Sequence, residues 1–581
     1  MKTLMNANRL PIRIHSHFIR ILFVLGPLWG WPQYVWGAPF LPPSDPRIIL
    51  KTMEEEMNRS IQKLKLDNFH SPYFLAYRLI HNQEIELIAS YGSSYRKNFR
   101  NQKIIYVEAR YGDYTLDNVD RGFNGPWNYG PLDNAVPSLK QALWDLTDSA
   151  YKQALSSYLI KKARKTTDLE KDKLNDFSRE KKKGIQAILP PLSLPQGIDI
   201  LEQSLQRVSF TFGQYPEIHD SYTKAELRWS QRYLITTEGT RLVTPNAFVP
   251  HSVSFYASSR ADDGMLIESS RRWSAQEVQK IPPEEELMEA TKEMSQEIKA
   301  LRLAELQPPY AAPAILDAEF TGVFFHEAIG HRLEGQRQRD EEESQTFKDL
   351  VGQKIIPEFL SVVDDPSLKT FKGIPLHGHY HYDDEGMPSQ KVVLVEKGIL
   401  KNFLMSRRPI KGFFHSNGHG RSDGTKHPVG RMANLMILAE NPTPPSRLKD
   451  LLIQECRARG KPYGFILKGS LGGDNPTNRS SPQTLRVKAK LVYRVDAKTG
   501  QETLVRGVEL VGTPLVVINK IIAAGDDQTL ANTYHCGAES GWVSVDQIAP
   551  SVLVSEIELQ RIEEDRKRPP ILPSPLHDKA K

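Results

Sequence analysis

The chain has 581 residues, more than one hydrophobic core usually serves, so two domains are expected. Hydrophobic residues make up 39% and charged residues 25%, the balance of an ordinary soluble protein. The net charge is +6, and the first 37 residues hold four basic and no acidic residues, which leaves +2 for the rest. The charge therefore gives no reason to expect a protein that binds nucleic acid.

Residues 1–37 are predicted to be a secretory signal peptide. A basic stretch ends at Arg20, the apolar run Ile21–Trp31 follows, and small residues at Gly37 and Ala38 offer a cleavage site. The apolar run has 11 residues, which is too short to span a bilayer, and no later segment is long and apolar enough. We expect an exported protein, periplasmic or extracellular, with no stable membrane span after cleavage. The alternative is a membrane anchor that stays uncleaved.

Residues 38–306 are predicted to form a mixed α/β N-terminal domain. Helices are expected where apolar residues repeat every three or four positions, and strands where apolar and polar residues alternate. The predicted helices are Ile48–Leu66, Ile198–Val208 and Pro283–Ala304, and the predicted strands are Tyr73–His81, Ile85–Gly92, Lys103–Tyr111, Ala225–Thr236 and Ser252–Ser259. A charged helical insert is expected at about 138–185, ended by Pro190–Pro195. Its mixed charges are typical of a solvated helix face.

Residues 314–562 are predicted to form a β-rich C-terminal domain, which follows a proline-containing hinge at Gln307–Pro313. Strands alternate there with glycine turns, and helices are few. The charged, proline-rich end, residues 563–581, predicts a flexible tail. The expected fold class is therefore α+β with two domains.

The stretch His326-Glu327-Ala328-Ile329-Gly330-His331 can hold a metal and activate a water at one place. Neutral imidazoles are good Zn²⁺ ligands, and a carboxylate beside the metal can take a proton from water. On a regular helix, histidines five residues apart point roughly 140° apart, too far for easy chelation. A local widening to i→i+5 hydrogen bonding, a π-bulge, would bring them together, and Gly330 is the residue most tolerant of such a distortion. We therefore predict a distorted helix that carries a metal.

A catalytic zinc usually takes three protein ligands, so a third residue is needed. Cys536 is a candidate, because it precedes Gly537 in a predicted turn that follows a strand at Leu515–Ile521. His535 competes with it, and so do His377, His379 and His381, which alternate as on one face of a strand. Cys456 has helical apolar neighbours and is interpreted as a packed core residue. These residues alone leave the choice of third ligand open.

The ordered motifs from about Ala314 to about Leu559 resemble those of the TldD/PmbA metallopeptidases. They are Phe320–Phe325 with His326–His331, Leu333-Glu334-Gly335, Val362–Asp365, Asp383–Gly386, Glu396–Leu400, Ser416–Gly418, Gly430–Asn434 and Cys536-Gly537. The order of these blocks agrees with the family as well as their content. The N-terminal half is compatible with the family's N-terminal domain but has no comparably sharp motif.

The resemblance implies a metal site and a reaction. It implies that His326, His331 and Cys536 bind Zn²⁺ and that Glu327 is the general base of a zinc-dependent metallopeptidase. It further implies peptide or unfolded-protein substrates, and a homodimer or a heterodimer with a related subunit. The alternatives are a non-catalytic scaffold or assembly factor stabilised by zinc, and an exported zinc amidase that acts on a non-peptide substrate.

Two further groups are weighed as helpers of the reaction. Arg431 could donate to a developing oxyanion, although a buried or surface ion pair is the simpler interpretation. Asp383, Asp384 and Glu385 could accept hydrogen bonds from the metal-binding histidines, or could simply form an acidic turn before Gly386.

Overall fold

The computed structural model describes residues 46–66, 68–120, 122–133, 135–165, 174–180, 186–188, 197–245, 251–531, 534–563 and 566–577. The predicted signal peptide and the stretch Pro190–Pro195 lie outside the described residues. Residues 43–581 form one compact unit, to which everything below refers. Within the part of the chain that the structure describes, no helix is both long and apolar enough to cross a membrane.

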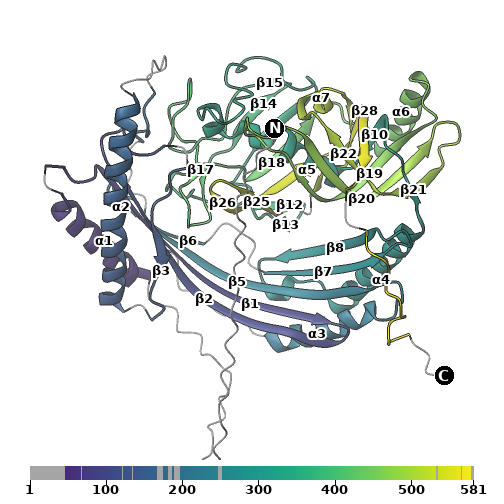
Figure 1. The fold of residues 1–581 in the computed structure, drawn as a ribbon, viewed down its shortest axis with the longest axis horizontal. Helices are drawn as coiled ribbons and strands as arrows, with labels where there is room; N and C mark the ends of the chain where they lie inside the picture. The colour runs from purple at the N-terminus through teal and green to yellow at the C-terminus, as the bar shows by residue number, and fades with distance from the viewer. Residues whose placement is uncertain are drawn as a thin grey trace, which may run out of the picture. The chain divides into compact units, whose positions relative to one another are not determined.

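The N-terminal half is built on one twisted sheet in the order β3-β2-β1-β5-β6-β4, to which β7 and β8 are added beyond β5 (Figure 1). Its strands are β1 (Phe74–Ser90), β2 (Ser93–Arg110), β3 (Trp127–Tyr129), β4 (Gln186–Ile188), β5 (Asp220–Thr236), β6 (Arg241–Pro245), β7 (His251–Arg260) and β8 (Leu266–Ala275). Its helices are α1 (Pro46–Lys63), α2 (Val136–Lys165), α3 (Ile198–Phe212) and α4 (Glu284–Leu303). The helices expected near residues 48–66, 198–208 and 283–304 are confirmed.

Two predicted strands of this sheet are in fact one. The strands expected at Tyr73–His81 and Ile85–Gly92 are joined in β1, which pairs with β2 and β5 without a break through residues 82–84. The polar run Asn82-Gln83-Glu84 interrupts the apolar alternation and so imitates a turn in the sequence. The backbone hydrogen bonds to the strands on both sides keep the segment extended.

Within the described residues, the charged insert is helical in its first part and not in segment 174–180. Helix α2 ends at Lys165, and the described segment 174–180 has no helix. Two side chains hold this segment against the rest of the protein. Asp176 forms ion pairs with Lys161 (2.7 Å) and Arg339 (2.6 Å), and the Phe177 ring lies between two guanidinium groups. These tertiary contacts outweigh the helical pattern of the insert.

The C-terminal half contains two main sheets. One has the order β19-β10-β28-β22-β20-β21-β9 with β23 against β28, and the other has the order β15-β14-β11-β18-β27-β24. The first is formed by β9 (Glu305–Leu306), β10 (Tyr310–Leu316), β19 (Tyr463–Asp474), β20 (Leu485–Asp496), β21 (Glu502–Arg506), β22 (Val508–Gly512), β23 (Ile521–Ala524) and β28 (Val552–Arg561). The second is formed by β11 (Leu360–Asp364), β14 (Val392–Glu396), β15 (Ile399–Leu400), β18 (Asn434–Ala439), β24 (Thr529–Leu530) and β27 (Asp546–Ala549).

Short elements complete this half. They are the strand pairs β12 (Thr370–Phe371) with β13 (Ile374–Pro375), β16 (Gly420–Arg421) with β17 (Val429–Gly430) and β25 (His535–Ala538) with β26 (Gly541–Ser544), and the helices α5 (Ala318–Phe325), α6 (Pro445–Ala458) and α7 (Pro514–Ile518). The strand predicted at Leu515–Ile521 is wrong, because this segment is α7 followed by β23. Pro514 suits the first turn of a helix, and a short apolar run does not by itself distinguish a buried helix from a strand.

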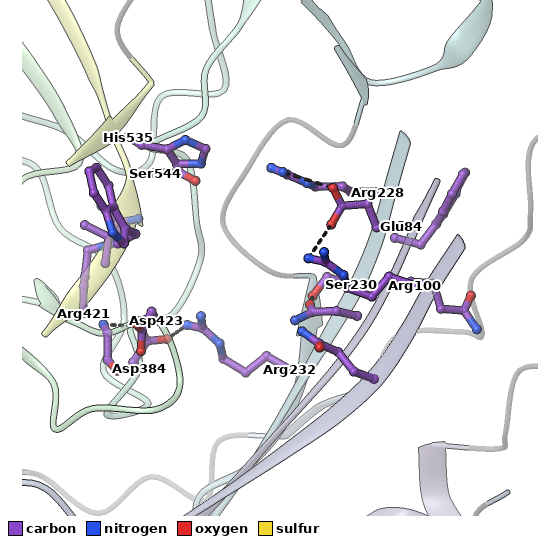
Figure 2. Close-up of a pocket in the computed structure, with 17 residues that line it drawn as sticks. Glu84, Arg100, Arg228, Ser230, Arg232, Asp384, Arg421, Asp423, His535 and Ser544 are labelled. Carbon is purple, nitrogen blue, oxygen red and sulfur yellow. Dashed lines mark hydrogen bonds and ion pairs between the residues drawn. The ribbon is translucent and has the colours of Figure 1, made fainter. Parts of the chain in front are cut away.

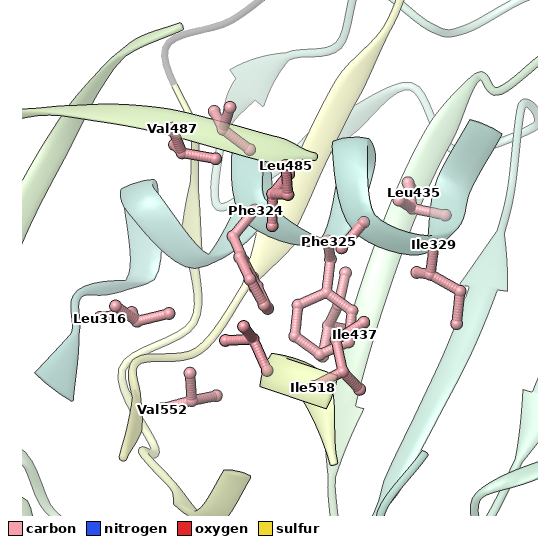
Figure 3. Close-up of a cluster of buried hydrophobic side chains, with 14 of the residues drawn as sticks. Leu316, Phe324, Phe325, Ile329, Leu435, Ile437, Leu485, Val487, Ile518 and Val552 are labelled. Carbon is pink, nitrogen blue, oxygen red and sulfur yellow. The ribbon is translucent and has the colours of Figure 1, made fainter. Parts of the chain in front are cut away.

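Helix α5 lies in the main core of the C-terminal half, between the two sheets (Figure 3). Its side chains Phe324 and Phe325 are fully buried beside Ile437 and Ile518. Asp317 caps the helix: one carboxylate oxygen accepts from the backbone N–H of Phe320 (2.7 Å), and the other accepts from that of Gly469 in β19 (2.9 Å). The helix is thereby fixed at its start, and the residues that follow it are held at a defined place.

Candidate metal centre

The helix changes its winding at the predicted metal-binding motif. Residues His326–Gly330 form a single π-helical turn after α5, in which the His331 N–H donates to the His326 carbonyl five residues earlier. The predicted distortion is confirmed, but the reason given for Gly330 is wrong. Gly330 has an ordinary right-handed helical backbone, and a Cβ there would lie 2.2 Å from the Met432 sulfur. Glycine is therefore needed for close packing and not for backbone freedom.

The structure brings together the three ligands that the family resemblance implied. Cys536 Sγ lies 3.2 Å from His326 Nε2 and 3.3 Å from His331 Nε2. All three donor atoms lie within 4.8 Å of one another, and all three residues are buried. Tetrahedral zinc, with bonds of about 2.3 Å to sulfur and 2.0 Å to nitrogen, would place such donors roughly 3.5 Å apart. A donor set of one thiolate and two imidazoles at this spacing fits Zn²⁺.

The outer nitrogen of each imidazole is held by a neighbouring side chain. His331 Nδ1 lies 3.2 Å from Glu334 Oε1, so the carboxylate can accept its proton. His326 Nδ1 lies 3.0 Å from the amide nitrogen of Gln547, whose buried oxygen has no partner among the described residues. Exchange of the two ends of this amide would let the oxygen accept from Nδ1–H. In both rings, a proton on Nδ1 leaves Nε2 free to bind a metal.

The charges around Cys536 favour its thiolate form. Burial by itself would raise the pKa of the thiol, but His331, His326 and Arg431 outweigh burial and hold this pKa well below the ordinary value. Glu334 is affected in a similar way: burial disfavours its charge, yet Arg337, His331 and Arg431 lower its pKa to about 2. An ionised thiol is the form that binds zinc, so the protein is prepared for a metal ion.

Glu327 lies beside the three donor atoms and lines the same cavity of about 540 Å³. One of its carboxylate oxygens is 4.0 Å from His326 Nε2. Its backbone carbonyl accepts from Asn475 Nδ2 at 2.6 Å, which fixes the start of the π turn. Removal from water raises the pKa of the carboxyl group, and this effect is larger than the opposing influence of the two histidines.

The other ligand candidates do not join the three donor atoms. Among the described residues, His326, His331 and Cys536 are the group that could hold a metal ion, and none of the competing histidines belongs to it. Cys536 and His535 lie in the hairpin β25–β26 and not in the predicted turn, and their side chains leave opposite faces of the strand. Cys456 is buried in the core on α6, as predicted.

The interpretation of His377, His379 and His381 as one strand face is wrong. Residues 376–381 are not in a strand. His377 lies between Asp546 (3.2 Å) and Ser274 Oγ (3.1 Å), which connects the second C-terminal sheet to β8. His379 Nδ1–H donates to the Pro366 carbonyl (2.9 Å). His377 and His379 therefore hold neighbouring segments of the fold together.

The acidic segment before Gly386 does not orient His326 or His331. Asp383 accepts from the backbone N–H groups of Glu385, Met387 and Gly420 at 2.8–2.9 Å, as in an acidic turn. Arg431 is fully buried, pairs with Glu334 (3.2 Å) and donates to the Cys536 carbonyl (2.8 Å). Arg431 thus positions the hairpin, and the simpler interpretation of this residue holds.

Two residues of the site were missed in the sequence. Glu334 follows His331 by three positions, a spacing that places both on one side of a helical turn, so this signal was present. Gln547 follows His326 by 221 residues, and nothing in its own neighbourhood indicates the contact. Only the pairing of β27 with β18 brings Gln547 under the helix.

Comparison with known proteins decides the family. Residues 309–561 match the C-terminal domain of the PmbA/TldA metallopeptidases. This C-terminal region belongs to the TldD/PmbA family. A metalloprotease of Methanocaldococcus jannaschii is 32% identical over 251 residues, 42% of this chain and 51% of that relative. A zinc metalloprotease TldD homolog of Saccharolobus solfataricus is 26% identical over 250 residues, 42% of this chain and 51% of that relative. The chain thus spans about half the length of the curated relatives it matches.

Solved structures of the same fold extend over more of the chain. A putative modulator of a DNA gyrase from Thermotoga maritima has a TM-score of 0.56 at 15% identity and covers 87% of this chain and 99% of its own. TldE from Thermococcus kodakarensis has a TM-score of 0.55 at 13% identity and covers 87% of this chain and 100% of its own. These likenesses establish a mixed α+β fold that includes the N-terminal half.

Proposed function

We propose that this chain is a zinc-dependent peptidase that hydrolyses peptide bonds in peptides or unfolded segments. The observation that carries the proposal is the convergence of His326, His331 and Cys536 beside the Glu327 carboxylate in one cavity. A purely structural zinc site has no use for a base. The names of the relatives, which are metalloproteases, agree with this chemistry.

The roles of the residues follow from their positions. When bound, zinc supplies a Lewis acid that polarises the scissile carbonyl and acidifies a water molecule. Glu327 takes the proton of the attacking water and passes it to the leaving amine. A carboxyl group with a raised pKa is suited to both steps, since it must hold the proton between them. Glu334 and Gln547 keep the two imidazoles oriented.

The wall of the cavity favours an extended substrate. The end of β19 and the loop after it, Gly472–Asn478, line one side, and the hairpin β25–β26 lines the other. Gly472 and Gly473 carry no side chain that would obstruct a peptide backbone. We propose peptide or unfolded-protein substrates on this basis.

The first test is the metal content of the purified protein, measured by elemental analysis for the wild type and for Cys536→Ala. About one zinc per chain in the wild type is expected, with loss in the variant. Cys456→Ala is the matched control, because this cysteine is buried in the core on α6 and should leave the zinc in place. A zinc-free wild type, or equal loss in both variants, would contradict the proposed centre.

The second test is peptide hydrolysis by Glu327→Gln. This variant should keep zinc and lose at least about 100-fold in rate, the contribution typical of a positioned acid–base group. A zinc-stabilised scaffold would keep its function in Glu327→Gln and show no hydrolysis in the wild type. An exported zinc amidase would cleave amide bonds outside peptides and leave unstructured peptides intact.

Assembly and location belong to the same proposal. We propose a homodimer or a heterodimer with a related subunit, since one solved structure of this fold is named TldE. We also propose export, on the basis of the N-terminal sequence alone. Mass measurement of the native protein and of its N-terminal peptide would test both.

A further inference from the structure

A second cavity, of about 220 Å³, lies against the metal-carrying hairpin (Figure 2). Both cavities are lined by His535 and Trp542, so they adjoin at the hairpin β25–β26. Successive side chains of a strand point to opposite faces, and His535 and Ser544 therefore leave the face opposite to Cys536. Figure 2 shows these two side chains at the second cavity. The hairpin thus separates the metal centre from this cavity.

The far wall of the second cavity is the polar face of the N-terminal sheet. Cross-strand neighbours Arg100, Glu84 and Arg228 form one row over β2, β1 and β5, and Gln102, Asn82 and Ser230 form the next. A sheet with one apolar face normally turns its polar face to water. Here that face is turned toward the metal-carrying hairpin, so its charges can contact a bound substrate.

The carboxylates of the cavity already have partners. Glu84 lies between Arg228 (3.3 Å) and Arg100 (4.0 Å), as Figure 2 shows. Asp384 accepts from the Ser422 N–H (2.7 Å) and pairs with Arg232. Asp423 accepts from the N–H and hydroxyl groups of Thr425, each at 2.8 Å. None of these acids requires a cation from outside the protein.

Arg228 also pairs with Glu226 (2.9 Å), so of the cavity's arginines it is Arg421 whose positive charge is not balanced in the same way. Arg421 is 3% exposed and lines the cavity, and within the described residues it forms no ion pair. Its contacts are a hydrogen bond to the Met432 carbonyl and the face of the Tyr380 ring (4.9 Å). Burial and the nearby guanidinium groups of Arg421 and Arg78 lower the pKa of Arg232 to about 9. An anion bound here would relieve this repulsion.

We propose that the cavity between Arg421 and the Arg228–Arg100 wall binds a carboxylate group of the peptide held at the metal centre. A guanidinium group binds a carboxylate through paired, charge-assisted hydrogen bonds, which suits this ligand. The carboxylate is either the C-terminus of the peptide or an acidic side chain. The inference rests on the proposed peptidase function for the identity of the ligand. The ligand reaches the cavity past Trp542, which is 68% exposed.

The test measures binding separately from hydrolysis. Zinc-loaded Glu327→Gln protein is titrated with fluorescent octapeptides of one sequence that end in a carboxylate or in a carboxamide, and with a pair that carries Glu or Gln near the end. A peptide with the recognised carboxylate should bind roughly tenfold more tightly than its neutral partner. The pair that shows the difference tells which carboxylate is recognised.

Each arginine of the cavity wall is then replaced by itself in the zinc-loaded Glu327→Gln protein. The affinity ratio is the affinity for the recognised peptide divided by that for its neutral partner. Arg228→Gln should reduce this ratio toward one, and so should Arg100→Gln at a more exposed second site. Arg96→Gln is the matched control, because Arg96 lies on the same strand as Arg100, pairs with Glu86 (3.5 Å) and lines neither cavity. Equal affinity for all four peptides, or an equal loss of the ratio in Arg96→Gln, would overturn the proposal.

Hydrolysis distinguishes this proposal from the function on which it rests. With Glu327 intact, Arg228→Gln should raise KM for the recognised peptide about tenfold and leave kcat unchanged. A persistent affinity ratio without any hydrolysis by the Glu327-intact protein would reject the peptidase and keep the cavity. Hydrolysis by the Glu327-intact protein with equal affinity for the charged and neutral peptides would keep the peptidase and reject the carboxylate site.

Discussion

Two buried polar clusters of this protein differ in how their charges are compensated. In the N-terminal half, Arg110 lies between Glu108 (2.7 Å) and Asp117 (2.8 Å), and Arg78 pairs with Glu108 (2.8 Å). At the metal centre, His326, His331 and Cys536 point their donor atoms at one another. The first cluster is neutralised by its own members, whereas the donors of the second are arranged for a cation.

In a third region, burial of two neighbouring carboxyl groups favours their protonated, uncharged form. Glu385 and Asp383 are buried near each other beside Gly420. Burial, together with the charge of Asp383, raises the pKa of Glu385 to about 8, and burial raises the pKa of Asp383 to about 6. The comparison teaches that buried charge alone does not indicate function. A cluster indicates function when its side chains direct their polar atoms at one point and do not neutralise one another's charge.

The largest expected effect is on stability, at the paired cluster. Asp117→Asn leaves Arg110 and Arg78 to share Glu108, so one buried positive charge of the cluster is uncompensated. The free energy of unfolding should fall by about 3–5 kcal/mol. Urea unfolding followed by tryptophan fluorescence measures this. Asp148→Asn is the control: it removes an exposed i,i+4 pair with Lys152 and should cost less than about 0.5 kcal/mol. Equal effects in both variants would show that the cluster does not depend on its charge balance.

The next effect is on activity, at the metal centre. A Cβ at Gly473 would lie 2.8 Å from Glu327 Cγ, so Gly473→Ala must displace the proposed base. Peptide hydrolysis should fall about 100-fold, as expected for a misplaced catalytic group, while zinc content and the unfolding midpoint change little. If Gly473→Ala loses zinc together with activity, the effect lies in the ligands and not in Glu327.

The third prediction concerns pH, at the protonated pair. The folded chain holds a proton on Glu385 up to about pH 8, whereas the unfolded chain releases it near the ordinary value of 4.5. The folded state therefore binds more protons in this window, and the free energy of unfolding should fall as pH rises from about 5 to 8. Glu385→Gln keeps an acceptor for the Arg407 N–H and should flatten this dependence. An unchanged slope in the variant would mean that Glu385 is ionised in the folded protein.

The smallest expected effect is at the helix that leads into the metal centre. Asp317→Ala removes the acceptor of the Phe320 N–H, so the free energy of unfolding should fall by about 1 kcal/mol. Asp317→Asn retains a capping oxygen and should stay close to the wild type in the same measurement. A loss of zinc in Asp317→Ala beyond the loss of stability would show that the cap also sets the position of His326.

Local sequence predicted three helices of the N-terminal half and the π turn at His326–Gly330 well. The spacing of His326 and His331 indicated the π turn, because two imidazoles five residues apart on one helix face require it. The apolar repeats indicated α1, α3 and α4. Errors arose where a local pattern was weak or was overruled. The run of residues 82–84 lacks apolar alternation, and 515–518 is apolar in a way that fits a helix and a strand equally.

The sequence by itself determined the chemistry available to this protein: two histidines and a carboxylate within six residues, and the family motifs around them. The tertiary structure alone decided which distant residues complete the site. Cys536 and Gln547 reach the motif through the hairpin β25–β26 and the pairing of β27 with β18. It alone also turned the polar face of the N-terminal sheet toward the same hairpin. Such contacts span 200 residues or more, and no local periodicity encodes them, because they depend on which sheets pack together.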